Sequence, residues 1–271
     1  MRNLFSIIFV STLLAVSAAG QRIAVISPAS SPAAENAATA VRTAISDRFR
    51  VLDASMTDSA FRSAELSNPF NMERGEARLV GSVVGCEKFI LVQAETPRRT
   101  SLEKDGYFEA WAAIFIVSSR SGRMYAWQLF SAEGPTPGSA QELLRKKIET
   151  SQLAGSVNGS PPAEPQDFPD VPQENTEKSF RPPMPFKRVK PRYTDTAYLY
   201  GIKATVDVAV NIDTDGRIVS ADIQRWAGFG LDEAVLTAIR EMNWRAAERG
   251  GRTLPMRVLL RYNFTKIDKE R

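Results

Sequence analysis

The stretch ATVDVAVNI, residues 204–212, decides the fold of the C-terminal part of this chain. Its even-numbered positions are all apolar, whereas the odd-numbered positions include Asp207 and Asn211. Successive side chains of a strand point to opposite faces of a sheet, so this alternation predicts a half-buried β-strand. The sequence DTDG, residues 213–216, and the apolar positions of residues 219–223 predict a tight turn and a return strand.

A helix and a third strand complete this unit. Apolar side chains recur at helical spacing over residues 231–242, and Asp232 and Glu233 lie in the first turn, where the helix dipole favours acids. Alternating apolar residues over 254–264 predict a closing strand, which gives the order β-β-α-β. Trp226 and Trp244 are expected in the core beside the sheet, with a binding platform as the alternative. The turn at 213–216 is expected to be a hairpin turn and not a calcium loop, because further ligands do not follow it.

Residues 22–153 predict a separate domain of mixed helices and strands in an α+β chain. Strands are expected at residues 23–26, 50–52, 88–94, 107–118 and 124–132, with a hairpin at Ser121-Gly122. A helix over residues 34–45 follows the first strand, and Cys86 is expected as a buried thiol. Three later helices are expected to begin at capping residues, namely Thr57 or Asp58, then Asn71, then Ser139; the last carries Leu143, Leu144 and Ile148 inward.

Prolines separate the two units. Eight of the chain's 16 prolines fall within residues 161–185, among acids and glutamines. Such a composition buries little apolar surface, and its prolines favour extended polyproline II, so residues 154–184 are predicted to be a flexible linker. The C-terminal domain is placed at residues 185–266, followed by a charged tail at 267–271.

The first 20 residues predict a secretory signal peptide. Arg2 precedes a short apolar run, residues 4–16, and small residues follow at 17–20. The alternative is an uncleaved membrane anchor, but a spanning helix needs about 20 apolar residues and this run is shorter. The expected location is the periplasm, or, under that alternative, the inner membrane with the chain facing the periplasm.

Composition excludes several kinds of chemistry. The chain has no histidine and one cysteine, which rules out His-based nucleophile pairs, His-ligated metals and internal disulfides. No cofactor, metal site or catalytic residue is expected, and an enzyme that uses carboxylates alone is the remaining enzymatic alternative. The net charge is +4, and the basic residues are interleaved with acids, so they do not indicate nucleic-acid binding.

The proline-rich segment followed by β-β-α-β resembles the C-terminal domain of TonB. The residues that carry the resemblance are Pro191-Arg192-Tyr193, Tyr200-Gly201-Ile202, Val206-Asp207-Val208, the 213–217 turn, the 228–235 stretch GFGLDEAV, Ala238-Ile239-Arg240, Trp244-Arg245-Ala246-Ala247 and the closing strand. The resemblance implies a periplasmic domain that captures an extended segment of an outer-membrane receptor by strand addition, a binding mode in which the unpaired groups of an edge strand are completed by a peptide.

The same resemblance implies which residues contact the partner. They are the family's aromatic element and the closing edge strand, namely Arg192, Tyr193, Met256, Arg257, Val258, Leu259, Leu260, Arg261 and Tyr262. The family contacts its motor through a membrane-spanning helix that bears a histidine, whereas this chain has no histidine and a predicted cleavable signal peptide. We therefore predict a periplasmic binding protein for an envelope partner, with an anchored energy transducer for transmembrane transport as the alternative.

Residues 22–153 resemble the α/β domain of the CsgG-like and TolB N-terminal group. The resemblance rests on residues 47–53, DRFRVLD, and on residues 85–92, GCEKFILV. It implies a scaffolding module, which would supply a second contact or a surface for a homo-oligomer.

Overall fold

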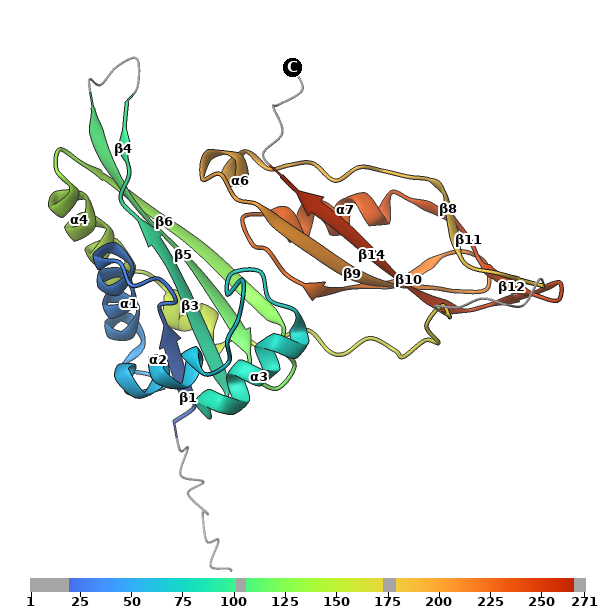
Figure 1. Cartoon of the computed structure of the whole chain (residues 1–271), viewed down its shortest axis with the longest axis horizontal. Coiled ribbons are helices and arrows are strands. Elements are labelled where there is room, and N and C mark those ends of the chain that lie inside the picture. Colours follow the sequence, from blue (N-terminus) through green and yellow to red (C-terminus); the bar gives the residue numbers. More distant parts are fainter. Residues whose placement is uncertain (1–19, 101–105, 173–178, 266–271) are drawn as a thin grey trace, which may run out of the picture.

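A computed structural model describes residues 20–100, 106–172 and 179–265. The expected signal peptide, up to residue 19, and the expected charged tail lie outside the described residues. The described chain forms two units side by side, each with its own sheet (Figure 1). Both helices and strands are present in both units, which confirms the α+β class.

The N-terminal domain is built on a six-stranded sheet. Three parallel strands stand in the order β2-β1-β3, and β5 pairs antiparallel with β3, β4 and β6. The strands are β1 (Arg22–Ile26), β2 (Arg50–Val51), β3 (Lys88–Glu95), β4 (Arg98–Arg99), β5 (Tyr107–Ser118) and β6 (Met124–Gly134). The apolar runs of β3 and β5 are buried on both faces, so both faces of this sheet are covered.

Two sets of elements cover those faces. Helices α1 (Pro32–Ile45), α4 (Pro137–Glu149) and α5 (Leu153–Asn158) pack on one face, against side chains such as Ile90 and Ile114. Helices α2 (Ala54–Arg62) and α3 (Arg74–Val84) cover part of the other face. The rest of that face, including Phe115, packs against the C-terminal domain.

The predicted strands of this domain are present, but its expected helix starts are wrong. The N-cap of α2 is Asp53, whose carboxylate accepts from the Met56 N–H. Glu73 caps α3 through a capping box with Glu76, and Thr136 caps α4. Several Ser, Thr, Asp and Asn residues stand near each helix start, and local sequence does not rank them.

In this domain, the burial of individual side chains agrees with the sequence prediction except at one position of α4. Leu143 was expected inside, but it is half exposed on α4, whereas Leu144 and Ile148 are buried. Cys86 is buried as expected.

The C-terminal domain has the predicted β-β-α-β order around a three-stranded antiparallel sheet. The sheet order is β10-β9-β14, formed by β9 (Ala204–Ile212), β10 (Ile218–Arg225) and β14 (Met256–Phe264). Helix α7 (Leu231–Arg240) packs on one face through residues such as Val235 and Ile239. Both Trp226 and Trp244 are buried, which confirms the core interpretation.

Short elements surround this sheet. Helix α6 (Asp195–Leu199) precedes β9, and the strands β11 (Asn243–Arg245), β12 (Ala247–Arg249) and β13 (Arg252–Leu254) lie between α7 and β14. Two further strands, β7 (Phe180–Arg181) and β8 (Met184–Lys187), pair with β12 and β11. The turn at residues 213–216 is a hairpin turn, in which the Asp213 carboxylate accepts from the N–H groups of Asp215 and Arg217.

Strand β9 differs from the half-buried strand that its alternation predicts. Asp207 and Asn211, on the polar face, are 2% and 1% exposed. Arginine side chains and residues 164–167 cover this face, so its polar groups are buried and paired. The alternation correctly predicted which side chains of β9 share a face, but it did not predict that arginines and residues 164–167 cover the polar face.

The expected flexible linker also differs in its described part. Residues 154–158 belong to α5, and residues 180–187 contribute β7 and β8. Between them, residues 159–172 run in an extended path along the C-terminal domain (Figure 1). A proline carbonyl can accept hydrogen bonds: the Arg123 side chain donates to that of Pro162, and the Arg257 backbone N–H donates to that of Pro169. We call residues 162–171 the linker strap.

Candidate functional site

The outer edge of β14 is the first part of the candidate site. Strand β14 pairs with β9 from Met256 to Phe264 without a bulge, and no other named strand pairs with it among the described residues. In an antiparallel pair, every second residue exchanges hydrogen bonds with the partner strand and the others point their backbone groups away. The backbone N–H and C=O of Arg257 point away from β9, so those of Leu259, Arg261 and Asn263 do so as well.

The first outward position is already occupied. The Arg257 N–H donates to the Pro169 carbonyl at 2.8 Å, and the Val171 N–H donates to the Arg257 carbonyl at 3.1 Å. Asp170 and Arg257 thereby form a parallel bridge. The linker strap thus covers the beginning of the edge, near Met256.

The second half of the edge is open. The Leu259 side chain is 62% exposed, and Arg261 and Asn263 are exposed beside it. Within the described chain, no backbone hydrogen bond joins these three residues to another segment on the outer side. At the opposite edge of the sheet, the end of β10 meets the N-terminal domain, where Glu73 bridges Arg225. The open half of β14 therefore offers a strand edge together with an exposed apolar side chain.

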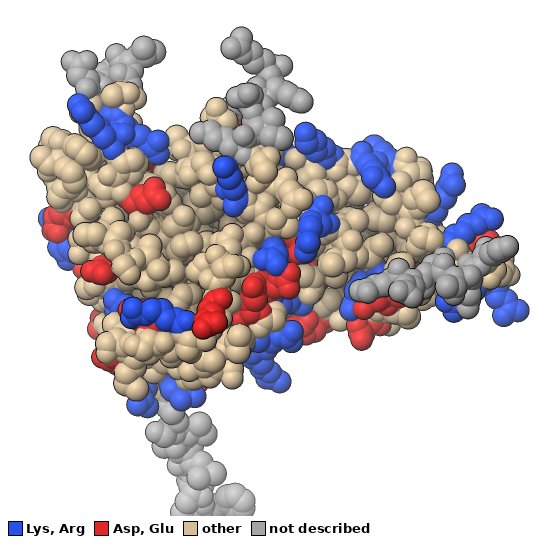
Figure 2. All heavy atoms as spheres, viewed as in Figure 1, with Lys and Arg blue, Asp and Glu red and all other residues tan. Residues whose placement is uncertain are grey.

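Three arginines form a groove on the polar face of the sheet, next to this edge. Arg74 comes from the start of α3, Arg123 from the turn before β6, and Arg257 from β14. Arg74 and Arg257, together with Asp222 and the linker strap, line a cavity of about 310 Å³. Arg123 pairs with Asp222 and Glu164 at its border. We call Arg74, Arg123, Arg257 and Asp222 the arginine groove. Charged side chains of both signs gather along the boundary between the two domains (Figure 2).

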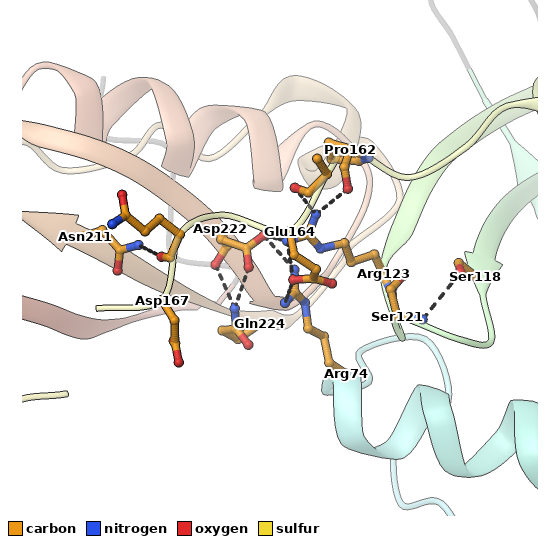
Figure 3. Close-up of polar contacts among 12 residues, drawn as sticks. Arg74, Ser118, Ser121, Arg123, Pro162, Glu164, Asp167, Asn211, Asp222 and Gln224 are labelled. Atoms are coloured by element: carbon orange, nitrogen blue, oxygen red, sulfur yellow. Dashed lines mark hydrogen bonds and ion pairs between the residues drawn. The ribbon is translucent and has the colours of Figure 1, made fainter. Parts of the chain in front are cut away.

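Carboxylates occupy the groove from both sides. Oδ1 of Asp222 lies 2.6 Å from Nη2 of Arg74 and 2.9 Å from Nη2 of Arg123. From the linker strap, Oε2 of Glu164 lies 2.9 Å from Arg123 and 3.5 Å from Arg74 (Figure 3). Arg123 also donates to the carbonyls of Pro162 and Ala163 at 2.7 and 3.0 Å. The strap is therefore held by charge and by backbone together.

The groove donors are not all used. Burial lowers the pKa of the Arg74 guanidinium, although the charge of Asp222 opposes this effect. Both Arg74 and Arg123 keep a buried Nε–H without a hydrogen-bond partner among the described residues. The Arg123 side chain is only 5% exposed. A buried donor without a partner costs free energy, so an acceptor that reached either Nε–H would stabilise the groove.

Asp207 fixes the polar face farther along the sheet. Its carboxylate accepts from Arg261 at 2.7 and 2.8 Å and lies 3.3 Å from Nε of Arg225. Burial alone would raise the pKa of Asp207, but the hydrogen bonds and charges of Arg261 and Arg225 outweigh it and hold the pKa below its ordinary value. Arg261 is thus oriented beside the open edge by an ionised partner.

Aromatic side chains join the two domains on the other side of the sheet. Trp111, Phe115 and Trp127 of the N-terminal sheet pack against Trp226 and Phe229, with ring centroids 5.6–6.3 Å apart. We call these five residues the apolar seam. Rings at such distances contribute beyond the area that they bury, so the two domains share one core.

Polar anchors flank the apolar seam. The Asn71 amide donates to the carbonyls of Thr205 and Trp226 at 2.8 and 2.6 Å and accepts from the Thr205 N–H at 2.9 Å. Tyr200 donates to Glu109 at 2.8 Å. Burial, followed by this contact, raises the pKa of Tyr200 to about 12. Asn71, expected as a helix cap, is instead a bridge between the domains.

A buried carboxylate supports the loop that carries Phe229. Asp232 accepts from the N–H groups of Ala227 and Gly228 at 3.0 and 2.7 Å. Its complete burial raises its pKa to about 7, although these hydrogen bonds favour the ionised form. The loop and the apolar seam therefore depend on a group that titrates near neutral pH.

The residues predicted to bind a partner do not form one patch. Met256 is buried, and Val258, Leu260 and Tyr262 face the core, whereas Arg257, Leu259 and Arg261 lie on the other face. The Tyr193 hydroxyl donates to the Ile202 carbonyl at 2.7 Å and lies 3.2 Å from that of Ala197, and its ring stacks on Phe264. Tyr193 therefore holds α6 against the far end of β14. Arg192 is exposed and pairs with Asp195 at 2.9 Å.

Sequence reasoning missed the arginine groove. Arg74 and Asp222 are 148 residues apart in the chain, and Arg123 and Glu164 are 41 apart. Neither pair has a spacing signal. The one available signal was in the linker, where acids recur at positions 164, 167 and 170.

Comparison with known proteins identifies one part of the chain. Residues 189–265 match the family described as Gram-negative bacterial TonB protein C-terminal. No curated protein matches the chain significantly.

Solved structures give distant matches. The TonB C-terminal domain of Pseudomonas aeruginosa is 23% identical, with 35% of this chain and 94% of that chain covered and a TM-score of 0.28. Lipoprotein GNA1162 from Neisseria meningitidis is 16% identical, with 52% and 99% covered and a TM-score of 0.34. The LpoB C-terminal domain from Salmonella enterica is 13% identical, with 42% and 82% covered and a TM-score of 0.28. The resemblance of residues 22–153 to the CsgG-like and TolB group stays a prediction.

The family match indicates a protein associated with the Gram-negative cell envelope. Of the helices in the described ranges, none combines the length and the hydropathy that crossing a membrane requires.

Proposed function

Because residues 189–265 form a TonB C-terminal domain, we propose that this protein binds an envelope partner by adding an extended segment of that partner to the outer edge of β14. The observation that carries the proposal is the open half of that edge. There the outward backbone groups of Leu259, Arg261 and Asn263 have no partner within the described chain, and the Leu259 side chain is exposed. An outer-membrane receptor segment is the expected partner.

Strand addition suits this edge for physical reasons. Main-chain hydrogen bonds supply affinity, and pockets for alternate side chains supply specificity. The exposed Leu259 side chain gives an apolar contact, and Arg261, oriented by Asp207, gives a charged one. An unprotected strand edge of this kind is otherwise a liability for aggregation, so an open edge favours a binding role.

The N-terminal domain would hold the sheet in a fixed orientation. The apolar seam and Asn71 attach it to the face and end of the sheet, away from the outer edge of β14. A homo-oligomer formed through the N-terminal domain remains a proposal, as do the periplasmic location and the cleaved signal peptide. We also propose that the protein is not an enzyme, and the lack of histidine supports this.

The family match also favours a second candidate, a transducer anchored by an uncleaved N-terminus and active in transmembrane transport. N-terminal sequencing of the protein isolated from the cell envelope separates the two candidates. A start near Gln21 supports the periplasmic binding protein, whereas a start at Met1 supports the anchored form.

Photo-crosslinking at the end of the edge tests strand addition. A photoreactive side chain replaces Asn263 in the full-length protein, in combination with either Leu259→Pro or Leu259→Ala. Proline removes an outward N–H that β9 does not use, whereas alanine keeps it. We expect an adduct with an envelope protein in the Ala background and its loss in the Pro background.

Equal adducts in both backgrounds would contradict strand addition, as would an equal adduct from a photoreactive side chain at Val219. Val219 is half exposed on β10 and so serves as a matched position on the other edge strand. Thermal unfolding of the Pro and Ala variants checks that both keep the fold.

A further inference from the structure

The linker strap presents its carboxylates at a regular spacing. Glu164, Asp167 and Asp170 are separated by three residues each, with prolines at 162, 165, 169 and 172 among them. Polyproline II has about three residues per turn, so such side chains lie along one side of the extended chain. The three carboxylates therefore form a row.

Each carboxylate of the row meets an arginine of the groove. Glu164 pairs with Arg123 and Arg74, Asp167 pairs with Arg257, and Oδ1 of Asp170 lies 3.8 Å from Nη1 of Arg257. The groove's own residues carry three positive charges against the single negative charge of Asp222. The row supplies the negative charge that this surplus attracts.

Backbone and apolar contacts add direction and register. Asp170 bridges Arg257 in parallel, and the Gln166 carbonyl accepts from the Asn211 amide at 2.8 Å. Val171 packs against the small cluster of Phe180, Ala247 and Met256. The strap is thus recognised by a charge row, a strand bridge and one apolar side chain, which are the elements of a peptide-binding site.

We infer that the arginine groove is a recognition site for extended, proline-spaced segments that carry a carboxylate at every third residue, and that the linker strap is its resident ligand. A partner segment of the same chemistry binds by displacing the strap, and thereby gains the first half of the β14 edge. That this partner is the same one that binds at Leu259 to Asn263 rests on the proposed function.

Two observations fit an exchangeable ligand. The strap carboxylates are 62–90% exposed, so their ion pairs are screened and individually weak. The buried Nε–H groups of Arg74 and Arg123 lack partners with the strap in place, so a better-fitting ligand can gain further hydrogen bonds. A tethered segment competes at an effective concentration in roughly the millimolar range, which sets the affinity that a free segment must exceed.

An NMR titration tests the site with a defined probe. The probe is a peptide with the sequence of residues 161–172, PPAEPQDFPDVP, added to the isotope-labelled full-length protein up to about 5 mM. Wild type is compared with a strap variant, Glu164→Lys, Asp167→Lys and Asp170→Lys. We expect the strap variant to bind the peptide at least about tenfold more tightly, because its own strap no longer competes.

The amide signals of Arg257 and Asn211 report the site. Both should shift on titration of the strap variant, and both shifts should vanish when the peptide acids are replaced by Gln and Asn. When Arg257→Glu is added, the Asn211 signal should no longer shift. The variant Glu65→Lys, Glu87→Lys and Glu95→Lys matches the charge change at exposed positions outside the groove, and it should behave as wild type.

Equal affinity in wild type and the strap variant, no binding to the strap variant, or equal binding of the amide peptide would each overturn the inference. None of these results concerns the crosslink at Asn263. Equal crosslinks in the Leu259→Pro and Leu259→Ala backgrounds, together with a successful titration, would refute strand addition alone.

Discussion

The apolar seam and the arginine groove both join the N-terminal domain to the C-terminal sheet, but their chemistry is opposite. In the seam, Trp226 and Phe229 are 1% exposed and packed among rings of the other domain. Against the groove, the strap carboxylates Glu164 and Asp167 are 62% and 90% exposed and contribute mostly charge. The seam excludes water, whereas the strap carboxylates border it.

This difference separates a permanent joint from an exchangeable one. Burial of aromatic rings contributes several kcal/mol of free energy, and loss of a ring leaves a cavity that neighbours fill poorly. An exposed ion pair contributes about 0–1 kcal/mol and weakens with salt. We therefore expect the seam to decide whether the two domains stay together, and the groove to decide what lies against β14.

Removal of a seam ring should have the largest effect. Phe229 contacts Trp111, Phe115, Trp127 and Tyr200. Phe229→Ala should lower the free energy of unfolding by about 3–5 kcal/mol, measured by urea denaturation. A loss below about 1 kcal/mol would show that the two domains do not share a core.

The next effect concerns pH, because Asp232 supports the loop of Phe229. Its pKa of about 7 lies above the ordinary value of 3.8. A raised folded-state pKa contributes stability below the unfolded-state pKa, and this contribution is lost as pH rises through the folded-state pKa. Wild type should thus lose a few kcal/mol more than Asp232→Asn between about pH 4 and 7.

Urea denaturation of both proteins across this pH range measures that difference. Asp207, with its lowered pKa, loses its contribution at acid pH in both proteins alike, so the comparison cancels it. A constant difference between wild type and Asp232→Asn at every pH would contradict the titration of a buried carboxyl.

The polar bridge of the seam should contribute less. Asn71→Ala removes three hydrogen bonds and leaves buried backbone groups of Thr205 and Trp226 without partners. The expected loss is about 1–3 kcal/mol. Asn36→Ala is the control, because Asn36 makes an exposed side-chain hydrogen bond to Gln141. Equal losses in the two variants would show that Asn71 does not join the domains.

Changes in the strap should have the smallest effect on stability. Glu164→Lys, Asp167→Lys and Asp170→Lys together should shift the free energy of unfolding by at most about 1 kcal/mol, since the pairs are exposed. The same urea experiments at low and high salt measure it. A loss as large as that of Phe229→Ala would mean that the strap is a structural part of the fold and not an exchangeable ligand.

Local sequence patterns predicted the helices and strands well, but they predicted the helix starts and the contacts between the domains poorly. The alternation of residues 204–212 gave β9 and the faces of its side chains, because a period of two follows from strand geometry. The predicted helix starts at Thr57 or Asp58, at Asn71 and at Ser139 were wrong because several polar residues can cap each helix. The role of Asn71 depends on Thr205 and Trp226, which lie more than 130 residues away.

The candidate site divides in the same way. The family resemblance predicted β14 as a strand edge, and the structure shows its second half open at Leu259. Composition predicted a free linker, since prolines and acids bury little apolar surface. In the folded protein, however, arginines of both domains bind the strap carboxylates, and the composition of the linker alone contains no sign of them.

Amide hydrogen exchange along β14, read residue by residue in the free protein, tests whether this edge has a covered and an open half. We expect slow exchange at Arg257, which donates to Pro169, and fast exchange at Leu259, Arg261 and Asn263. Exchange at Arg257 as fast as at Leu259, or equal protection of all four outward amides, would contradict this division of the edge.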